Sequence, residues 1–115
     1  MTFDQFRGYC LAKKRVSEET PFDEDTLVFK VAGKIFAITN ISTFDSVNLK
    51  VDPEWGEQMR DQYDWVVPAY HMNKKHWVTI KMDGAVKDLL LKQWIDTSYD
   101  LVVQNLTKRE RLSIK

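Results

Sequence analysis

Residues 27–39 read LVFKVAGKIFAIT, and this stretch decides the fold class. The segments 27–31 and 35–39 are rich in β-branched and aromatic residues, and the Ala32-Gly33-Lys34 segment between them is typical of a tight turn. We therefore predict two antiparallel strands joined as a hairpin. Lys30 interrupts the apolar run, which indicates that one face of the sheet meets solvent.

More strands are expected on the C-terminal side of this hairpin. Residues 46–51 (SVNLKV) alternate polar and apolar side chains, which is the clearest two-residue period in the chain. Residues 76–82 (HWVTIKM) repeat the pattern, and residues 65–67 fit a short strand that ends at Pro68. On the N-terminal side, the acidic residues 16–25 are predicted to form a loop, because Pro21 forbids a regular helix there.

Three helices are predicted around these strands. One spans residues 3–14, with Thr2 and Gln5 placed for a capping box. The second begins at Asp52-Pro53-Glu54 and runs to about residue 63, and the third spans residues 86–105. The order of elements predicts an α+β fold, an antiparallel β-sheet with helices packed on one face. Residues 1–106 are expected to form a single domain, and residues 107–115 a basic, flexible C-terminal tail.

Composition narrows the function classes. The 115 residues contain 17 lysines and arginines and 17 aspartates and glutamates, so the formal net charge is zero. This balance argues against a histone-like protein that binds phosphate through bulk positive charge. We find no apolar run long enough for a membrane span and no signal peptide. The single cysteine suits a reducing compartment, so we expect a cytoplasmic protein.

The sequence lacks the common signatures of catalysis and metal binding. We find no phosphate-binding glycine loop and no nucleophile elbow. Cys10 lies on the apolar side of a predicted helix, which favours a structural role over a nucleophilic one. His71 and His76 lack the partners of a metal site, and the acidic residues 18–25 lack the spacing of a calcium loop. We therefore expect no enzyme activity, no cofactor and no metal.

Residues 70–77 (YHMNKKHW) are the densest group of residues suited to binding. The two lysines suit phosphate, Asn73 suits an adenine edge, and Tyr70 or Trp77 suits base stacking. The structural alternative makes Trp77 a core residue, Tyr70 a packing residue and the lysines a solubilising turn. Lys34 in the hairpin turn and Lys50 on the polar side of its strand would extend the basic surface.

Several motifs together resemble the MmcQ/YjbR family of small bacterial proteins. They span residues 21–106 and include PF at 21–22, DTLVFKV at 25–31, GKIFA at 33–37, VNLK at 47–50, VPAYHMNKKHW at 67–77 and IDTSYDLV at 95–102. Two positions differ from the common family pattern, since Asp23 replaces a glycine and Val51 replaces a cysteine. The resemblance implies a CyaY-like fold and a proposed DNA-binding role, by analogy with a "double wing" domain.

Two functional hypotheses follow from these residues and this resemblance. The first is a monomeric protein that binds double-stranded DNA through basic hairpin wings, with the contact residues Lys34, Lys50, His71, Asn73, Lys74, Lys75 and His76. The second is a ligand- or protein-binding module that uses residues 70–77 as the wall of a polar pocket. An exposed, flat or saddle-shaped basic face favours DNA, whereas a concave pocket lined by Tyr70, His71 and Asn73 favours a ligand.

Overall fold

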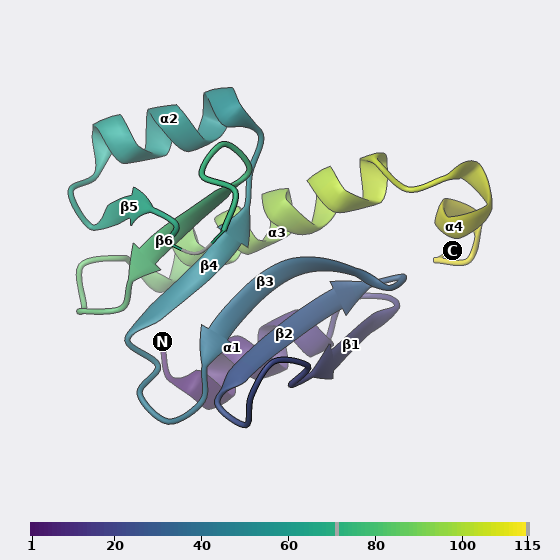
Figure 1. Cartoon of the computed structure of the whole chain (residues 1–115), viewed down its shortest axis with the longest axis horizontal. Coiled ribbons are helices and arrows are strands. Elements are labelled where there is room, and N and C mark those ends of the chain that lie inside the picture. The colour runs from purple at the N-terminus through teal and green to yellow at the C-terminus, as the bar shows by residue number, and fades with distance from the viewer. Residues whose placement is uncertain (71, 115) are drawn as a thin grey trace.

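The computed structural model describes residues 1–70 and 72–114, and within them a six-stranded antiparallel sheet has the order β1-β2-β3-β4-β6-β5 (Figure 1). The strands are β1 (Val16–Glu19), β2 (Thr26–Val31), β3 (Lys34–Asn40), β4 (Ser46–Lys50), β5 (Val66–Pro68) and β6 (Trp77–Lys81). The helices in this part of the chain are α1 (Phe3–Leu11), α2 (Pro53–Gln62), α3 (Asp88–Gln104) and α4 (Lys108–Leu112). The predicted α+β class is confirmed.

The central β2–β3 hairpin has a two-residue turn. Ala32 (φ 48°) and Gly33 (φ 82°) both adopt left-handed backbone conformations, which match the twist of the flanking strands. The pairing register shifts after Phe29, so that Phe29 pairs with Ala37 and Lys30 pairs with Ile35. The skipped residue, Phe36, is fully buried. The irregularity thus lets Phe36 enter the core and keeps Lys30 opposite Ile35.

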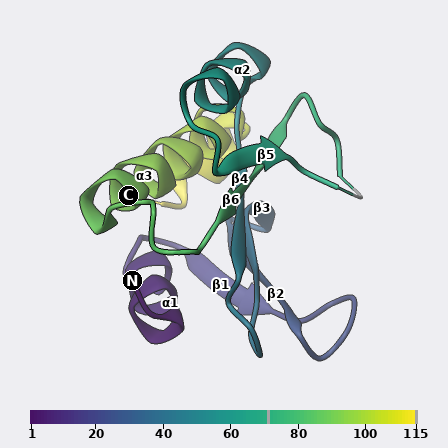
Figure 2. The ribbon, with the colours of Figure 1, turned by 90° about the vertical axis from the view of Figure 1, so that its left-hand side faces the viewer.

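Helices α1 and α3 lie on one side of the sheet, and α2 lies beside its β5–β6 end (Figure 2). Helix α3 packs across β2, β3 and β4, α1 packs against β1, and α2 packs against β5 and β6. Between the sheet and these helices lies the main core, whose fully buried large side chains include Phe6, Phe29, Phe36, Leu49, Ile80, Leu91 and Ile95. The alternation predicted for residues 46–51 is confirmed, because Val47 and Leu49 are buried while the intervening residues of β4 are half-buried.

The helix boundaries follow the local sequence signals. Thr2 and Gln5 form the predicted capping box of α1, and the Asp52 side chain accepts a hydrogen bond from the backbone N–H of Trp55 at the start of α2. Within residues 107–115, Thr107 and Glu110 form a second capping box that begins α4. No helix in the described part of the chain combines the length and apolarity that crossing a bilayer requires.

The helix predicted over residues 3–14 ends at Leu11, and the loop predicted over residues 16–25 is wrong for its first four residues. Residues 16–19, predicted as part of a loop, form the edge strand β1, which pairs antiparallel with β2. Two acidic side chains of β1 make ion pairs: Glu18 with Arg7 of α1, and Glu19 with Lys30 of β2. Both cationic partners belong to neighbouring elements, so the acidic composition of the segment alone did not reveal these contacts.

Candidate functional site

The sheet face opposite α1 and α3 carries no helix in the described part of the chain, and we call it the open face. Two loops project from this side of the sheet (Figure 2). The β1–β2 loop comprises residues 20–25, and the β5–β6 loop comprises residues 69–76. A small apolar cluster of Val28, Ile38, Ala69 and Trp77, with Ile35 and Met72 packed against it, lies apart from the main core. The open face is therefore partly apolar at its centre.

A first hollow of about 560 Å³ lies where the β2–β3 turn meets the end of α3; we call it the basic hollow. Lys30, Lys34, Lys50 and His76 contribute its cationic or protonatable side chains, and the other lining residues are Gly33, Ile35, Trp77, Val102, Asn105 and Leu106. The structure thus brings together three predicted site residues, Lys34, Lys50 and His76, from three separate segments. No carboxylate is among these lining residues.

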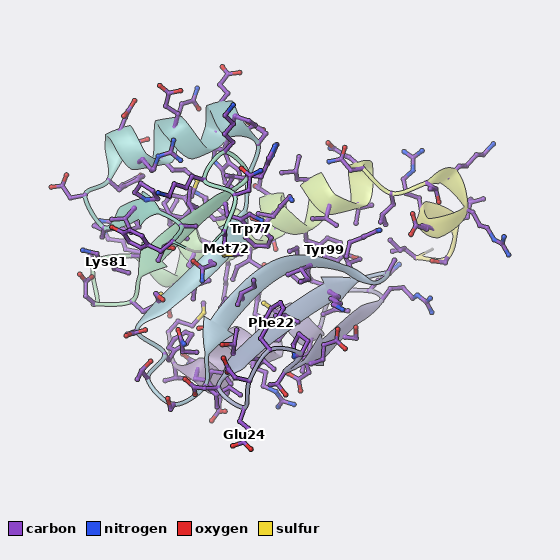
Figure 3. All side chains as sticks on the ribbon, viewed as in Figure 1. Phe22, Glu24, Met72, Trp77, Lys81 and Tyr99 are labelled. Atoms are coloured by element: carbon purple, nitrogen blue, oxygen red, sulfur yellow. The ribbon has the colours of Figure 1, made fainter. Side chains whose placement is uncertain are left out.

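A second hollow of about 450 Å³ lies between the two projecting loops; we call it the ring hollow. Its walls include Phe22 from the β1–β2 loop, Tyr70 and Met72 from the β5–β6 loop, and Trp77 from β6. The remaining lining residues come from the strands and are Thr26, Ile35, Ile38, Thr39, Asn40 and Asn48. In Figure 3 the labelled side chains of Phe22, Met72 and Trp77 lie over the sheet on the side nearest the viewer.

Trp77 and Ile35 line both hollows, so the two hollows adjoin. The Nζ atom of Lys50 lies 5.2 Å from the centroid of the Trp77 ring, which is a cation–π distance. Trp77 is only 8% exposed, whereas Phe22 and Tyr70 are each 69% exposed. Trp77 therefore forms a buried partition, and the rings of the two loops are free to meet a ligand.

Three further predicted site residues, Asn73, Lys74 and Lys75, lie on the β5–β6 loop and are not among the lining residues of either hollow. Lys74 and Lys75 are exposed, and the Nζ atom of Lys74 lies 5.8 Å from the centroid of the Tyr70 ring. The side-chain oxygen of Asn73 accepts a hydrogen bond from the backbone N–H of Lys75 at 2.9 Å, so this oxygen shapes the turn. His71 lies outside the described residues.

The β1–β2 loop is acidic, and two of its carboxylates are held by backbone groups. Asp23 accepts hydrogen bonds from the backbone N–H groups of Asp25 and Thr26, which lower its pKa. Asp25 accepts a hydrogen bond from the backbone N–H of Ser42, which lowers its pKa as well. Both groups are therefore ionised at neutral pH. Negative charge consequently lies beside Phe22, and positive charge lies beside the basic hollow and Tyr70.

In the described part of the chain, neither the thiol of Cys10 nor the His, Asp and Glu side chains form a reactive or metal-binding group. Cys10 is buried, and this burial raises the pKa of its thiol, which disfavours the reactive thiolate. The described residues contain no cluster of three or more His, Cys, Asp or Glu side chains that would hold a metal ion.

Sequence reasoning missed Phe22, Met72 and the two amides, Asn40 and Asn48. Part of the signal was present, since Asn48 lies on the same polar side of its strand as Lys50. Phe22 follows Pro21 in an acidic segment, where a large exposed ring is unusual. Its position opposite the β5–β6 loop depends on the order of strands in the sheet, which sequence alone did not give.

Comparisons with known proteins agree on the family. The family model described as YjbR matches residues 11–101. The chain is 32% identical over 112 residues to YjbR of Escherichia coli K12, covering 96% of this chain and 95% of that protein. It is 35% identical over 96 residues to YbdF of Escherichia coli O157:H7, covering 83% and 79% respectively.

Solved structures give the same result. The crystal structure of the Deinococcus radiodurans protein DR2400 is similar, with a TM-score of 0.91, 41% identity and coverage of 98% of this chain and 87% of that one. A crystal structure of a Pseudomonas syringae protein has a TM-score of 0.73 and 28% identity, covering 88% and 98% respectively. Because the family model spans most of the chain and the relatives match nearly end to end, the chain belongs to the MmcQ/YjbR family.

Proposed function

We propose that this protein binds DNA with the open face of its sheet and has no catalytic activity. In this proposal the DNA contacts come from the β2–β3 hairpin, which carries Lys34 at its turn, and from the β5–β6 loop, which carries Lys74 and Lys75. The protein acts as a monomer in the cytoplasm, where chromosomal DNA of a bacterium is accessible. The family resemblance suggests DNA as the ligand, and the open face supplies the contact residues.

The observation that best supports the proposal is the convergence of Lys34, Lys50 and His76 on one hollow, whose lining residues include no carboxylate although Glu19 pairs with the lining residue Lys30. In a protein of zero net charge, phosphate binding needs a local excess of cationic side chains over carboxylates. Lys74 and Lys75 extend the cationic surface along the neighbouring loop. Lysines at these positions would hold the phosphate backbone and fix the orientation of the protein on DNA.

A second candidate function is binding of a small anionic ligand. The adjoining hollows support it, because a concave site with a few polar groups is typical of small-molecule pockets. The two candidates differ in their need for Lys74 and Lys75, which lie outside both hollows. A DNA backbone extends beyond the hollows and would reach these lysines, whereas a small ligand would not.

We expect the double variant Lys74→Ala/Lys75→Ala to bind DNA more weakly and with less dependence on salt. Removing two phosphate contacts should lower the slope of log K against log salt by up to about 2. The measurement is fluorescence anisotropy with a labelled random-sequence duplex at about 50 and about 200 mM salt, where the native protein should bind at micromolar concentration or tighter and more weakly at the higher salt.

The matched control is Lys87→Ala/Lys92→Ala, which removes the same charge from exposed positions at and after the start of α3, on the helix side of the sheet. This control should keep the native slope. If both double variants keep the native slope of log K against log salt, the β5–β6 loop is not part of the DNA interface. If the native protein fails to bind any DNA at the lower salt, the DNA proposal is wrong.

A further inference from the structure

We infer that the open face takes DNA as an unpaired strand, with one base in the ring hollow and an adjoining phosphate in the basic hollow. This inference rests on the proposed function and adds the form of DNA that is bound. The inference is supported by two adjoining hollows that differ in chemistry. One is lined by rings and amides, and the other by lysines.

The size of the ring hollow favours a single base over a duplex. A volume of about 450 Å³ accommodates one planar base with its sugar, and the two projecting loops border the hollow. A DNA duplex is too wide to enter such a space, and its bases are already stacked on their neighbours. Aromatic side chains therefore stack on bases that are unpaired or turned out of the helix.

The rings are placed where stacking requires them. Phe22 and Tyr70 come from opposite loops, line the same hollow and are each 69% exposed. Exposed aromatic rings of this kind on an otherwise polar loop indicate a binding surface. Trp77 closes the hollow toward the basic side, and Met72 packs beside it in the apolar cluster. A base entering between the loops would bury both exposed rings.

The floor of the ring hollow offers a polar group for a base edge. The hydroxyl of Thr79 donates a hydrogen bond to the side-chain oxygen of Asn48, and this contact fixes the orientation of the amide. One lone pair of the amide oxygen is thus used, and the N–H₂ group supplies the donors of Asn48 to a ligand. Two N–H donors suit a carbonyl oxygen on a base, such as those of thymine.

The distribution of charge determines on which side of Trp77 the phosphate of the bound strand lies. The ionised carboxylates of Asp23 and Asp25 lie in the same loop as Phe22, so a phosphate would be repelled at that end. Lys50 stands over Trp77 at the boundary of the hollows, and Lys34 lies in the basic hollow beyond it. The phosphate is therefore expected on the lysine side of Trp77 and the base on the acidic side.

The experiment compares a labelled oligothymidine strand of about 12 nucleotides with a blunt duplex of the same length. The native protein should bind the single strand more tightly than the duplex. Phe22→Ala and Tyr70→Ala should each weaken single-strand binding at least about fivefold, because stacking on one ring contributes about 1 kcal/mol or more per base. Tyr70→Phe removes only the hydroxyl and keeps the ring, so this variant should bind the single strand as the native protein does.

The control variant is Leu89→Ala, which removes a 70% exposed apolar side chain from α3. It should leave binding of both DNA forms unchanged. If the native protein binds duplex at least as tightly as the single strand, or if the Phe22 and Tyr70 variants bind the single strand normally, the inference is overturned while DNA binding itself stands. Failure of both DNA forms to bind would instead overturn the proposed function.

Discussion

A Phe6→Ala variant is expected to lose about 3–5 kcal/mol of unfolding free energy, the usual cost of emptying a buried phenylalanine site. Phe6 is fully buried on α1, and its ring meets that of Phe29 edge to face with centroids 5.6 Å apart. It also contacts the ring of Phe44. Because domains of this size have a total stability of about 5–15 kcal/mol, the loss would leave the variant marginally folded.

The measurement for Phe6→Ala is urea unfolding followed by circular dichroism, with Phe22→Ala as the matched control. The same side-chain atoms are removed in both variants, but Phe22 is largely exposed, so its variant should stay within about 0.5 kcal/mol of the native protein. A native-like unfolding midpoint for Phe6→Ala would contradict the placement of α1 against the sheet. The control also shows that loss of DNA binding in Phe22→Ala is not caused by unfolding.

A Lys50→Glu variant is expected to lose DNA affinity by about a hundredfold or more. Removing a charged contact to phosphate costs about 1.5–3 kcal/mol, and the new carboxylate adds repulsion. Lys50 lies at the boundary of the two hollows, where its ammonium group stands over Trp77. The loss should be larger at about 50 mM than at about 200 mM salt, because added salt screens charge. Anisotropy titrations at both salt concentrations measure it.

Lys81→Glu separates this local effect from the change in net charge. Lys81 is exposed on β6 and shares the sheet side of Trp77 and Thr79, but it lines neither hollow and lies away from Trp77 in Figure 3. The two variants change the net charge equally. Similar losses of DNA affinity in both variants would mean that overall charge governs binding and that Lys50 makes no specific contact with DNA.

Local signals predicted the elements that depend on neighbouring residues. The capping box of Thr2 and Gln5, the helix start at Asp52 and the alternation of residues 46–51 all involve contacts within a few positions, and the structure has each of them. Strand β1 was missed because its acidic side chains are matched by Arg7 and Lys30 from other elements. Tertiary ion pairs of this kind leave no local pattern in the sequence.

The residue types of the candidate site were predictable from the sequence, but their arrangement in space was not. Lys34, Lys50 and His76 were identified as candidates from their residue types, and the sheet places them around one hollow. The ring hollow requires Phe22 and Tyr70 to line the same space, although strands β2–β5 and helix α2 separate them in sequence. Asn73 was assigned to base recognition from its amide alone, but the amide oxygen accepts a backbone hydrogen bond within its own turn.

Backbone amide shifts during titration of the isotope-labelled protein with DNA would locate the DNA-binding surface. If DNA binds the open face, the shifts will be concentrated at Lys34, Lys50, Tyr70 and Lys75, with none along the outer surfaces of α1 and α3. Shifts confined to the helices, or no shifts with DNA in excess at about 50 mM salt, would show that DNA does not bind the open face.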